Sequence, residues 1–313
     1  MRERTLGSLG PKVSLLGLGC NNFGLRIDRE ASRAVIHKAL DLGITFFDTA
    51  DVYGNRGGSE TFLGEFLGDR RKDIVLASKF GNAMDEAGTM KGTSRRYIMA
   101  AVEASLKRLK TDWIDLYQLH RFDSATPMEE TLRALDDLVT QGKIRFIGTS
   151  QTAAWQLVGM QWTARQHGLS PVVSCMTEYS LLVRDAEREL VPAMQAYGVG
   201  LLPFYPLASG FLSGKYRKGA PMPAGGRLTK GKRYSARFMT DANWQVMEQL
   251  EAFCSTRGCT LLELAFGWLA AQPVVSSVIA GATKPDQLEA NAHAVELELS
   301  AQDLAEIDRL TGN

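Results

Sequence analysis

The stretch DIVLASKF, residues 73–80, is mostly apolar and has the length of a β-strand. It is followed by SRRYIMAAVEASLKRLKT (94–111), whose apolar residues recur with a helical period, and then by a second strand-like stretch, IDLYQLH (114–120). Near-continuous apolar strands joined by helices indicate a parallel sheet that is buried on both faces. This unit decides the fold class because the rest of the chain repeats it.

The same strand-then-helix unit occurs eight times, with strands expected at residues 13–19, 44–50, 73–80, 114–120, 144–150, 171–177, 199–206 and 275–282. Eight right-handed crossovers without a break in composition favour closure into one (β/α)8 TIM barrel, an α/β fold. A doubly wound open sheet is the alternative. The piece RTLGSLGPKVS (4–14) is expected to form an N-terminal β-hairpin at the barrel bottom, and the stretches 241–258, 261–272 and 300–312 supply extra C-terminal helices. We expect residues 1–313 to form a single barrel domain.

Composition narrows the class of partner. The net charge of +1 and the pI of about 7.7 argue against nucleic acid or an anionic membrane as the main partner. The N-terminal residues contain no secretory h-region, and no run approaches the ~20 apolar residues of a membrane span. The four cysteines, Cys20, Cys175, Cys254 and Cys259, form no CxxC pair, so reduced thiols in the cytoplasm are expected. These features carry no prediction of oligomeric state.

Ionisable side chains stand at the ends of three neighbouring strands. Asp48 ends the second strand, Lys79 the third and His120 the fourth, while Tyr53 lies just past the second. Each has a structural interpretation of its own, as a cap, a surface cation or a core histidine. In a barrel, however, the carboxyl ends of the strands meet at one mouth, where the chemistry of this fold is found. We therefore expect these four side chains to form one site.

Such a set permits proton transfer to a carbonyl oxygen. A tyrosine has a pKa of about 10, and a lysine ammonium within hydrogen-bond reach favours the phenolate and lowers that value. Asp48 can pair with Lys79 and keep it charged, and His120 can orient the carbonyl. No acyl-transfer nucleophile with a paired base is present, and no clustered His, Cys and carboxylate set predicts a metal site.

Four motifs resemble those of the aldo-keto reductases in order and spacing: FFDTADVYG (46–54), VLASKFG (75–81), DLYQLHR (115–121) and GKIRFIGTS (142–150). Within that family the chain resembles bacterial NADPH-dependent members and the branch that contains potassium-channel β subunits. The resemblance implies reduction of aldehydes or ketones to alcohols by hydride transfer from NADPH. It also implies that Tyr53 is the proton donor, that Asp48 and Lys79 tune it, and that His120 helps to polarise the carbonyl.

The same resemblance implies a set of cofactor contacts. They are Gly19, Cys20, Ser150, Gln151, Phe204, Leu207, Ser209, Gly210, Gly281, Thr283, Lys284, Gln287 and Asn291. Phe204 would stack under the nicotinamide, residues 207–210 would bind the pyrophosphate, and the positive charge of Lys284 favours NADPH over NADH. Met176 stands where relatives commonly have glutamine. The substrate pocket is expected to include Asn22, Phe23, Val52, Arg121 and Phe122, which would enclose a small-molecule carbonyl substrate.

Two other functions compete with this prediction. A Schiff-base aldolase would use Lys79 as a free amine, although a nearby Asp48 favours the ammonium form. A regulatory module would bind the nucleotide and turn over slowly, as the potassium-channel β subunits are thought to do. The segment 215–237 carries eight basic residues and no acidic one, and it fits a solvated loop, a flap over the cofactor phosphates, or a contact with an anionic substrate. Trp155 and Trp162 are expected to be packing residues on the fifth helix.

Overall fold

The computed structural model describes residues 1–312, with the side chain of Lys230 outside the description, and its centre is a parallel sheet of eight strands. The strands lie in the order β10-β3-β4-β5-β6-β7-β8-β9. Their bounds are β3 (Leu16–Gly19), β4 (Phe46–Asp48), β5 (Val75–Phe80), β6 (Ile114–Leu119), β7 (Ile144–Ser150), β8 (Val172–Glu178), β9 (Gly200–Phe204) and β10 (Val278–Gly281). Leu201 of β9 forms a parallel bridge to Val275 just before β10, which brings the two outer strands together. The predicted (β/α)8 barrel is confirmed.

The N-terminal hairpin is also confirmed. Strands β1 (Glu3–Thr5) and β2 (Lys12–Ser14) pair antiparallel, with Thr5 opposite Lys12. Leu6 and Val13 of this hairpin are fully buried and pack with Phe46 and Leu116, which point into the barrel. The hairpin thus fills one end of the barrel with apolar side chains and leaves the other end for polar groups.

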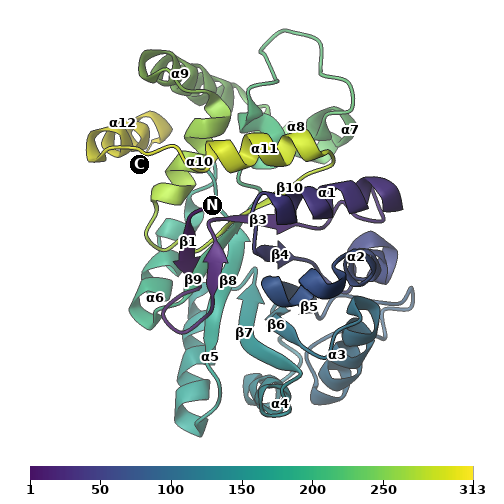
Figure 1. Cartoon of the computed structure of the whole chain (residues 1–313). Coiled ribbons are helices and arrows are strands. Elements are labelled where there is room, and N and C mark those ends of the chain that lie inside the picture. The colour runs from purple at the N-terminus through teal and green to yellow at the C-terminus, as the bar shows by residue number, and fades with distance from the viewer. Residues whose placement is uncertain (313) are drawn as a thin grey trace.

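Helices surround the strands (Figure 1). Their bounds are α1 (Arg29–Asp41), α2 (Tyr53–Phe66), α3 (Arg95–Leu109), α4 (Met128–Thr140), α5 (Ala154–His167), α6 (Leu190–Tyr197), α7 (Arg227–Lys230), α8 (Lys232–Phe238), α9 (Asp241–Arg257), α10 (Leu261–Ala271), α11 (Pro285–Ala294) and α12 (Ala301–Thr311). Short 3₁₀ turns occupy η1 (Gly68–Asp73), η2 (Asp185–Glu187) and η3 (Ala208–Ser213). Asp28 and Ser94 cap α1 and α3 through their side chains, and Gly168 and Gly198 end α5 and α6 in the left-handed conformation. The extra C-terminal helices α9, α10 and α12 pack beside one another.

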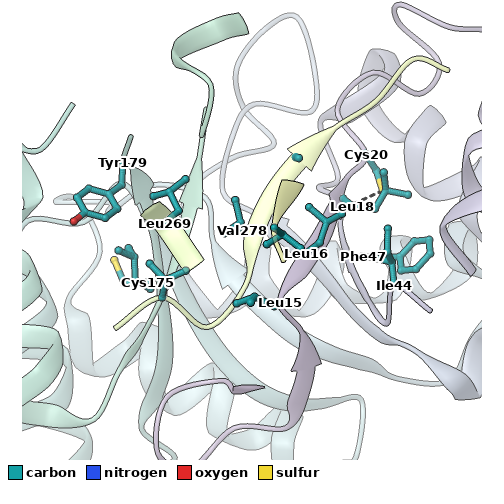
Figure 2. Close-up of a cluster of buried hydrophobic side chains, with 14 of the residues drawn as sticks. Leu15, Leu16, Leu18, Cys20, Ile44, Phe47, Cys175, Tyr179, Leu269 and Val278 are labelled. Carbon is teal, nitrogen blue, oxygen red and sulfur yellow. Dashed lines mark hydrogen bonds between the residues drawn. The ribbon is translucent and has the colours of Figure 1, made fainter. Parts of the chain in front are cut away.

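Two apolar layers hold the barrel, one outside the strands and one inside. Figure 2 shows part of the outer layer, with Leu16 and Leu18 of β3 beside Val278 of β10. Successive strand residues point to opposite faces, so Phe47 joins the outer layer and Phe46 the inner one. The same alternation directs the residue two places after Phe46, which is Asp48, into the barrel.

The prediction that Trp155 and Trp162 pack inside is wrong, because their exposed fractions are 68% and 60%. Helix α5 carries apolar residues on every face, so periodicity could not distinguish its buried side, which is formed by Leu157, Met160 and Ala164. Among the described residues, no helix is long and apolar enough to cross a membrane.

Candidate active site

The four side chains that end neighbouring strands meet at the open end of the barrel. Lys79 Nζ donates to Asp48 Oδ2 at 2.7 Å, to the carbonyl oxygen of Thr49 at 2.8 Å and to the Tyr53 hydroxyl at 3.4 Å. The ring of His120 packs edge-on against Tyr53 with a centroid separation of 5.6 Å. Lys79 is fully buried and Asp48 almost so. The structure therefore joins carboxylate, ammonium and phenol in one hydrogen-bonded chain.

A left-handed turn positions Tyr53. Residues 54–57 all have positive φ, between 58° and 117°, before regular helical geometry begins in α2. A Cβ on Gly54 would lie 2.5 Å from the carbonyl oxygen of Phe23 and 2.6 Å from the amide nitrogen of Ser59, so only glycine fits there. The turn also uses Asn55 and Arg56 in a conformation that L-residues rarely adopt. Strain of this kind persists where the surroundings enforce it, and here it places the phenol above the strand ends.

Gln118 is a member of this site that the sequence argument missed. Its Nε2 donates to Asp48 Oδ1 at 3.1 Å, and the side chain is fully buried. Gln118 lies opposite Lys79 in the β5–β6 register. Each oxygen of the buried Asp48 carboxylate thus has its own donor, as a buried charge requires. The available signal was strand alternation, because Gln118 precedes His120 by two residues and must share its face.

Burial and charge set the protonation of the chain of groups. Burial alone would lower the pKa of Lys79, but attraction to Asp48 and Tyr53 outweighs it and raises that pKa. Lys79 is therefore an ammonium, which disfavours the Schiff-base alternative. Burial raises the pKa of Tyr53, although the Lys79 charge acts in the opposite direction. We expected Lys79 to lower the pKa of Tyr53. The pKa is raised instead, because the cost of desolvating the phenolate is larger than its attraction to the single ammonium of Lys79. Tyr53 is consequently a protonated phenol at neutral pH.

His120 is neutral in this setting. Burial, followed by the charges of Lys79 and Arg121, lowers its pKa to about 3. Gln151 Nε2 donates to the His120 carbonyl oxygen at 3.4 Å, which links the ends of β6 and β7. A neutral imidazole at the edge of a cavity can donate one hydrogen bond to a carbonyl oxygen without carrying a charge itself.

These groups border a cavity of about 920 Å³. It is also bordered by most of the cofactor residues that we predicted: Gly19, Cys20, Ser150, Gln151, Phe204, Leu207, Ser209, Gly210, Gly281, Thr283, Gln287 and Asn291. Of the five predicted substrate-pocket residues, Asn22 and Arg121 border the cavity. The other three are not among the residues that border it. Phe23 is fully buried in the outer apolar layer, and Val52 directly precedes α2. The ring of Phe122 packs on that of Trp155, with 5.8 Å between the ring centroids. Lys284 is exposed at the start of α11.

One part of the cavity wall has the features of a phosphate cradle. Ala208, Ser209 and Gly210 have φ values of 47°, 60° and 97°, and successive residues of this kind turn backbone N–H groups into an anion-binding concavity. The Ser209 hydroxyl is buried and has no hydrogen-bond partner among the described residues. Lys215 and Arg227 border the same cavity without a carboxylate partner in the described part of the chain. A dinucleotide pyrophosphate would supply the missing acceptors, so these residues fit such a group.

Part of the basic segment 215–237 borders the cavity. Arg237 forms an ion pair with Glu178 at 2.9 Å, and the hydroxyls of Tyr234 and Tyr205 lie 3.3 Å apart. Arg227 lies 5.3 Å from the centroid of the Tyr205 ring. The segment is therefore tied to the strand ends of β8 and β9, which favours the flap interpretation over a freely solvated loop. The side chain of Lys230, also in the predicted basic set, lies outside the described residues.

The chain is similar to known proteins over nearly its whole length. Residues 15–311 match the family model described as "Aldo/keto reductase family". The chain is 36% identical over 307 residues to a "Probable voltage-gated potassium channel subunit beta" of Arabidopsis thaliana, with 95% of this chain and 92% of that protein covered. It is 36% identical over 312 residues to the "Uncharacterized oxidoreductase YrpG" of Bacillus subtilis (96% and 93%), and 35% identical over 321 residues to the "L-glyceraldehyde 3-phosphate reductase" of Escherichia coli (99% and 92%). No group of three or more His, Cys, Asp or Glu residues in the described part of the chain could hold a metal ion.

Proposed function

The chain belongs to the aldo/keto reductase family, and we propose that it is an NADPH-dependent enzyme that reduces aldehyde or ketone carbonyls to alcohols. The observation that carries the proposal is the hydrogen-bonded chain from Asp48 through Lys79 to Tyr53 at the wall of the cavity. This arrangement gives a protonated phenol, a fixed ammonium behind it and a neutral imidazole beside it. Together these three groups can protonate, stabilise and orient one carbonyl oxygen during reduction.

Each residue has a defined task in this proposal. The bound cofactor supplies the hydride. The Tyr53 hydroxyl donates its proton to the carbonyl oxygen, and the Lys79 ammonium stabilises the phenolate that remains. His120 donates a hydrogen bond to the same oxygen and holds it near Tyr53. Asp48 keeps Lys79 protonated and in place, and Gln118 fixes the Asp48 carboxylate.

The residues at the cavity wall support NADPH as the cofactor. Ser150, Gln151 and Phe204 would hold the nicotinamide, residues 207–210 the pyrophosphate, and the start of α11 the adenosine end. Met176 borders the cavity where a glutamine would offer an amide contact. Gln151 and Ser150 are left to make the amide contacts. Lys215 and Arg227 would face the pyrophosphate, which NADH shares, so the preference for NADPH rests on the cationic Lys284 at the start of α11, beside the adenosine end.

A nucleotide-binding module with slow turnover is the second candidate. It is favoured by the 36% identity to a protein named as a potassium channel β subunit. The presence of His120 together with Tyr53, Lys79 and Asp48 argues for catalysis instead, because a module that only binds the nucleotide has no use for a proton donor and a carbonyl-orienting group. Slow turnover with tight nucleotide binding would support the module.

The test is the loss of NADPH absorbance on mixing the protein with an activated aromatic aldehyde, with NADH in parallel. We expect Tyr53→Phe to lower kcat by about 100-fold or more, the usual contribution of a general acid, while NADPH binding persists. Tyr197→Phe is the matched control, because Tyr197 is 40% exposed on α6 and does not border the cavity. Wild-type turnover below one per minute across several aldehydes, with NADPH bound, would refute the reductase proposal.

A further inference from the structure

We propose that the cavity contains an anion subsite at Arg121, so that the carbonyl substrates of this protein carry a carboxylate or a phosphate group. The proposal rests on the proposed reductase function and names its substrate class. Arg121 directly follows His120, the residue that orients the carbonyl, and both border the cavity. No acidic side chain among the described residues forms an ion pair with Arg121.

The backbone around Arg121 is fixed on both sides. His120 before it is buried, and its amide donates to the carbonyl oxygen of Phe80 at 2.9 Å. Asp123 after it accepts hydrogen bonds from the amides of Thr93 at 3.0 Å and Ala125 at 2.9 Å. A loop held at both ends presents its side chain to a ligand with little loss of backbone entropy.

The charge around the cavity exceeds what its own carboxylates neutralise. The cationic residues that border it are Arg26, Lys79, Arg121, Lys215, Arg227, Arg233 and Arg237, and the anionic ones are Asp48 and Glu178. The two carboxylates are already paired, Asp48 with Lys79 and Glu178 with Arg237. Five cations therefore have no anionic partner among the described residues, although the whole chain has a net charge of only +1.

The order of the strands around the barrel separates Arg121 from the other four unpaired cationic residues. Arg26 follows β3, and Lys215, Arg227 and Arg233 follow β9, so all four come from the strands that flank β10. The phosphate cradle follows β9, and α11 begins after β10. Arg121 follows β6, which is the fourth strand from β10 in either direction around the barrel. The cofactor phosphates thus account for the four cations near β10 and leave Arg121 across the mouth.

The ligand chemistry follows from the side chain. A guanidinium offers a planar fork of donors that matches the two oxygens of a carboxylate or phosphate. Because Arg121 and His120 are consecutive, the anionic group of the substrate lies a short chain or one ring away from the reacting carbonyl. The carboxylate and the phosphate share this chemistry, and the experiment separates them.

The experiment compares two matched substrate pairs in wild type, Arg121→Gln and Arg121→Lys. The carboxylate pair is 4-carboxybenzaldehyde against its neutral methyl ester, and the phosphate pair is glyceraldehyde 3-phosphate against glyceraldehyde. For each pair the measured quantity is the ratio of kcat/KM for the charged substrate to that for the neutral one. Arg165→Gln is the matched control, because Arg165 is exposed on α5 and does not border the cavity.

We expect Arg121→Gln to lower at least one ratio by about 10-fold, the size expected for a partly solvated, charge-assisted contact. Arg121→Lys should lower it less, and Arg165→Gln should leave it unchanged. The pair that responds identifies the anion. Ratios that stay within 2-fold of wild type in Arg121→Gln for both pairs would overturn the proposal.

A binding measurement keeps this inference separate from the proposed function. Calorimetric titration of 4-carboxybenzaldehyde and of glyceraldehyde 3-phosphate into the protein with NADP⁺ needs no turnover. Weaker binding of either probe to Arg121→Gln, in a protein that reduces none of the aldehydes, would support the anion subsite and refute the reductase. Turnover of the neutral aldehydes with no dependence on Arg121 in either assay would support the reductase and refute the subsite.

Discussion

Replacing Gln118 with methionine would remove one donor from the Asp48 carboxylate and keep the volume of the side chain nearly constant. Gln118 Nε2 lies 3.1 Å from Asp48 Oδ1, and the two side chains are fully and almost fully buried. A hydrogen bond to a charged group contributes about 1.5–3 kcal/mol, and water cannot readily replace it at this depth. We therefore expect Gln118→Met to remove about 2 kcal/mol of stabilising free energy from the Asp48 carboxylate.

The structure also indicates where that cost appears. Burial already raises the pKa of Asp48, with Lys79 and Gln118 acting against it, so loss of Gln118 raises that pKa further and weakens the ion pair to Lys79. A less firmly held ammonium stabilises the Tyr53 phenolate less as the proton leaves. If the whole 2 kcal/mol falls on the transition state, kcat/KM drops by about 30-fold.

The assay is NADPH consumption with a good aldehyde, together with urea unfolding of the same proteins. Gln161→Met is the control, because Gln161 is also buried and bonds the backbone of Val172 at 2.7 Å and 3.2 Å, outside the barrel mouth. The control should lose stability and keep kcat/KM within about 2-fold. Gln118→Met with wild-type kcat/KM across pH 6 to 9 would refute the reasoning that Gln118 positions Asp48.

Three further predictions follow from the geometry. The rate of reduction should not change with protonation of His120 above about pH 5, because the pKa of His120 is lowered to about 3. The rate should fall only as pH rises through the pKa of Tyr53, which burial raises. A change of rate centred near pH 6.5 would contradict this prediction. Gly54→Ala should lower both thermal stability and kcat, because the added Cβ would lie only 2.5 and 2.6 Å from backbone atoms. A variant that is as active and as stable as wild type would contradict the conclusion that only glycine fits at this position. Asp51 is buried with no partner for either carboxylate oxygen among the described residues, and burial, followed by Glu60, raises its pKa to about 8. Between about pH 4 and 8 the folded protein keeps this proton and the unfolded chain releases it, so the free energy of unfolding falls by about 1.4 kcal/mol per pH unit. Asp51→Asn should flatten this slope in urea unfolding, and an unchanged slope would exclude the effect.

Much of the fold and the central part of the site follow from two periodicities in the sequence. Strand-length apolar runs separated by helical stretches predict the barrel, and strand ends at Asp48, Lys79 and His120 predict one mouth. Gln118 was accessible by the same logic, because inward-facing strand residues recur every second position. It was missed because a neutral amide in the motif DLYQLHR looks like an ordinary strand residue until its distance to Asp48 is known.

Other features depend on loop paths and surface packing, which no local period encodes. Phe23 and Phe122 stand close in sequence to cavity residues, yet the first is fully buried and the second packs on Trp155. Helix α5 mixes apolar and polar residues around its circumference, so the sequence could not show that Trp155 and Trp162 are exposed. The ties from Arg237 to Glu178 and from Tyr234 to Tyr205 join segments far apart in the chain, and they appear only once the strands are in order.

The charge distribution shows why a whole-chain quantity can conceal a local one. A net charge of +1 argues against a large anionic partner, since it averages 36 basic against 35 acidic residues. The barrel nevertheless brings seven of those basic residues to one cavity with two carboxylates, because strand ends and the segment 215–237 converge there. A concave site with excess positive charge attracts small anions and speeds their arrival, in a manner that salt weakens. The proposed NADPH site and the proposed anion subsite at Arg121 both follow from this local excess, which the sequence distributes over residues 26–237 and the fold concentrates.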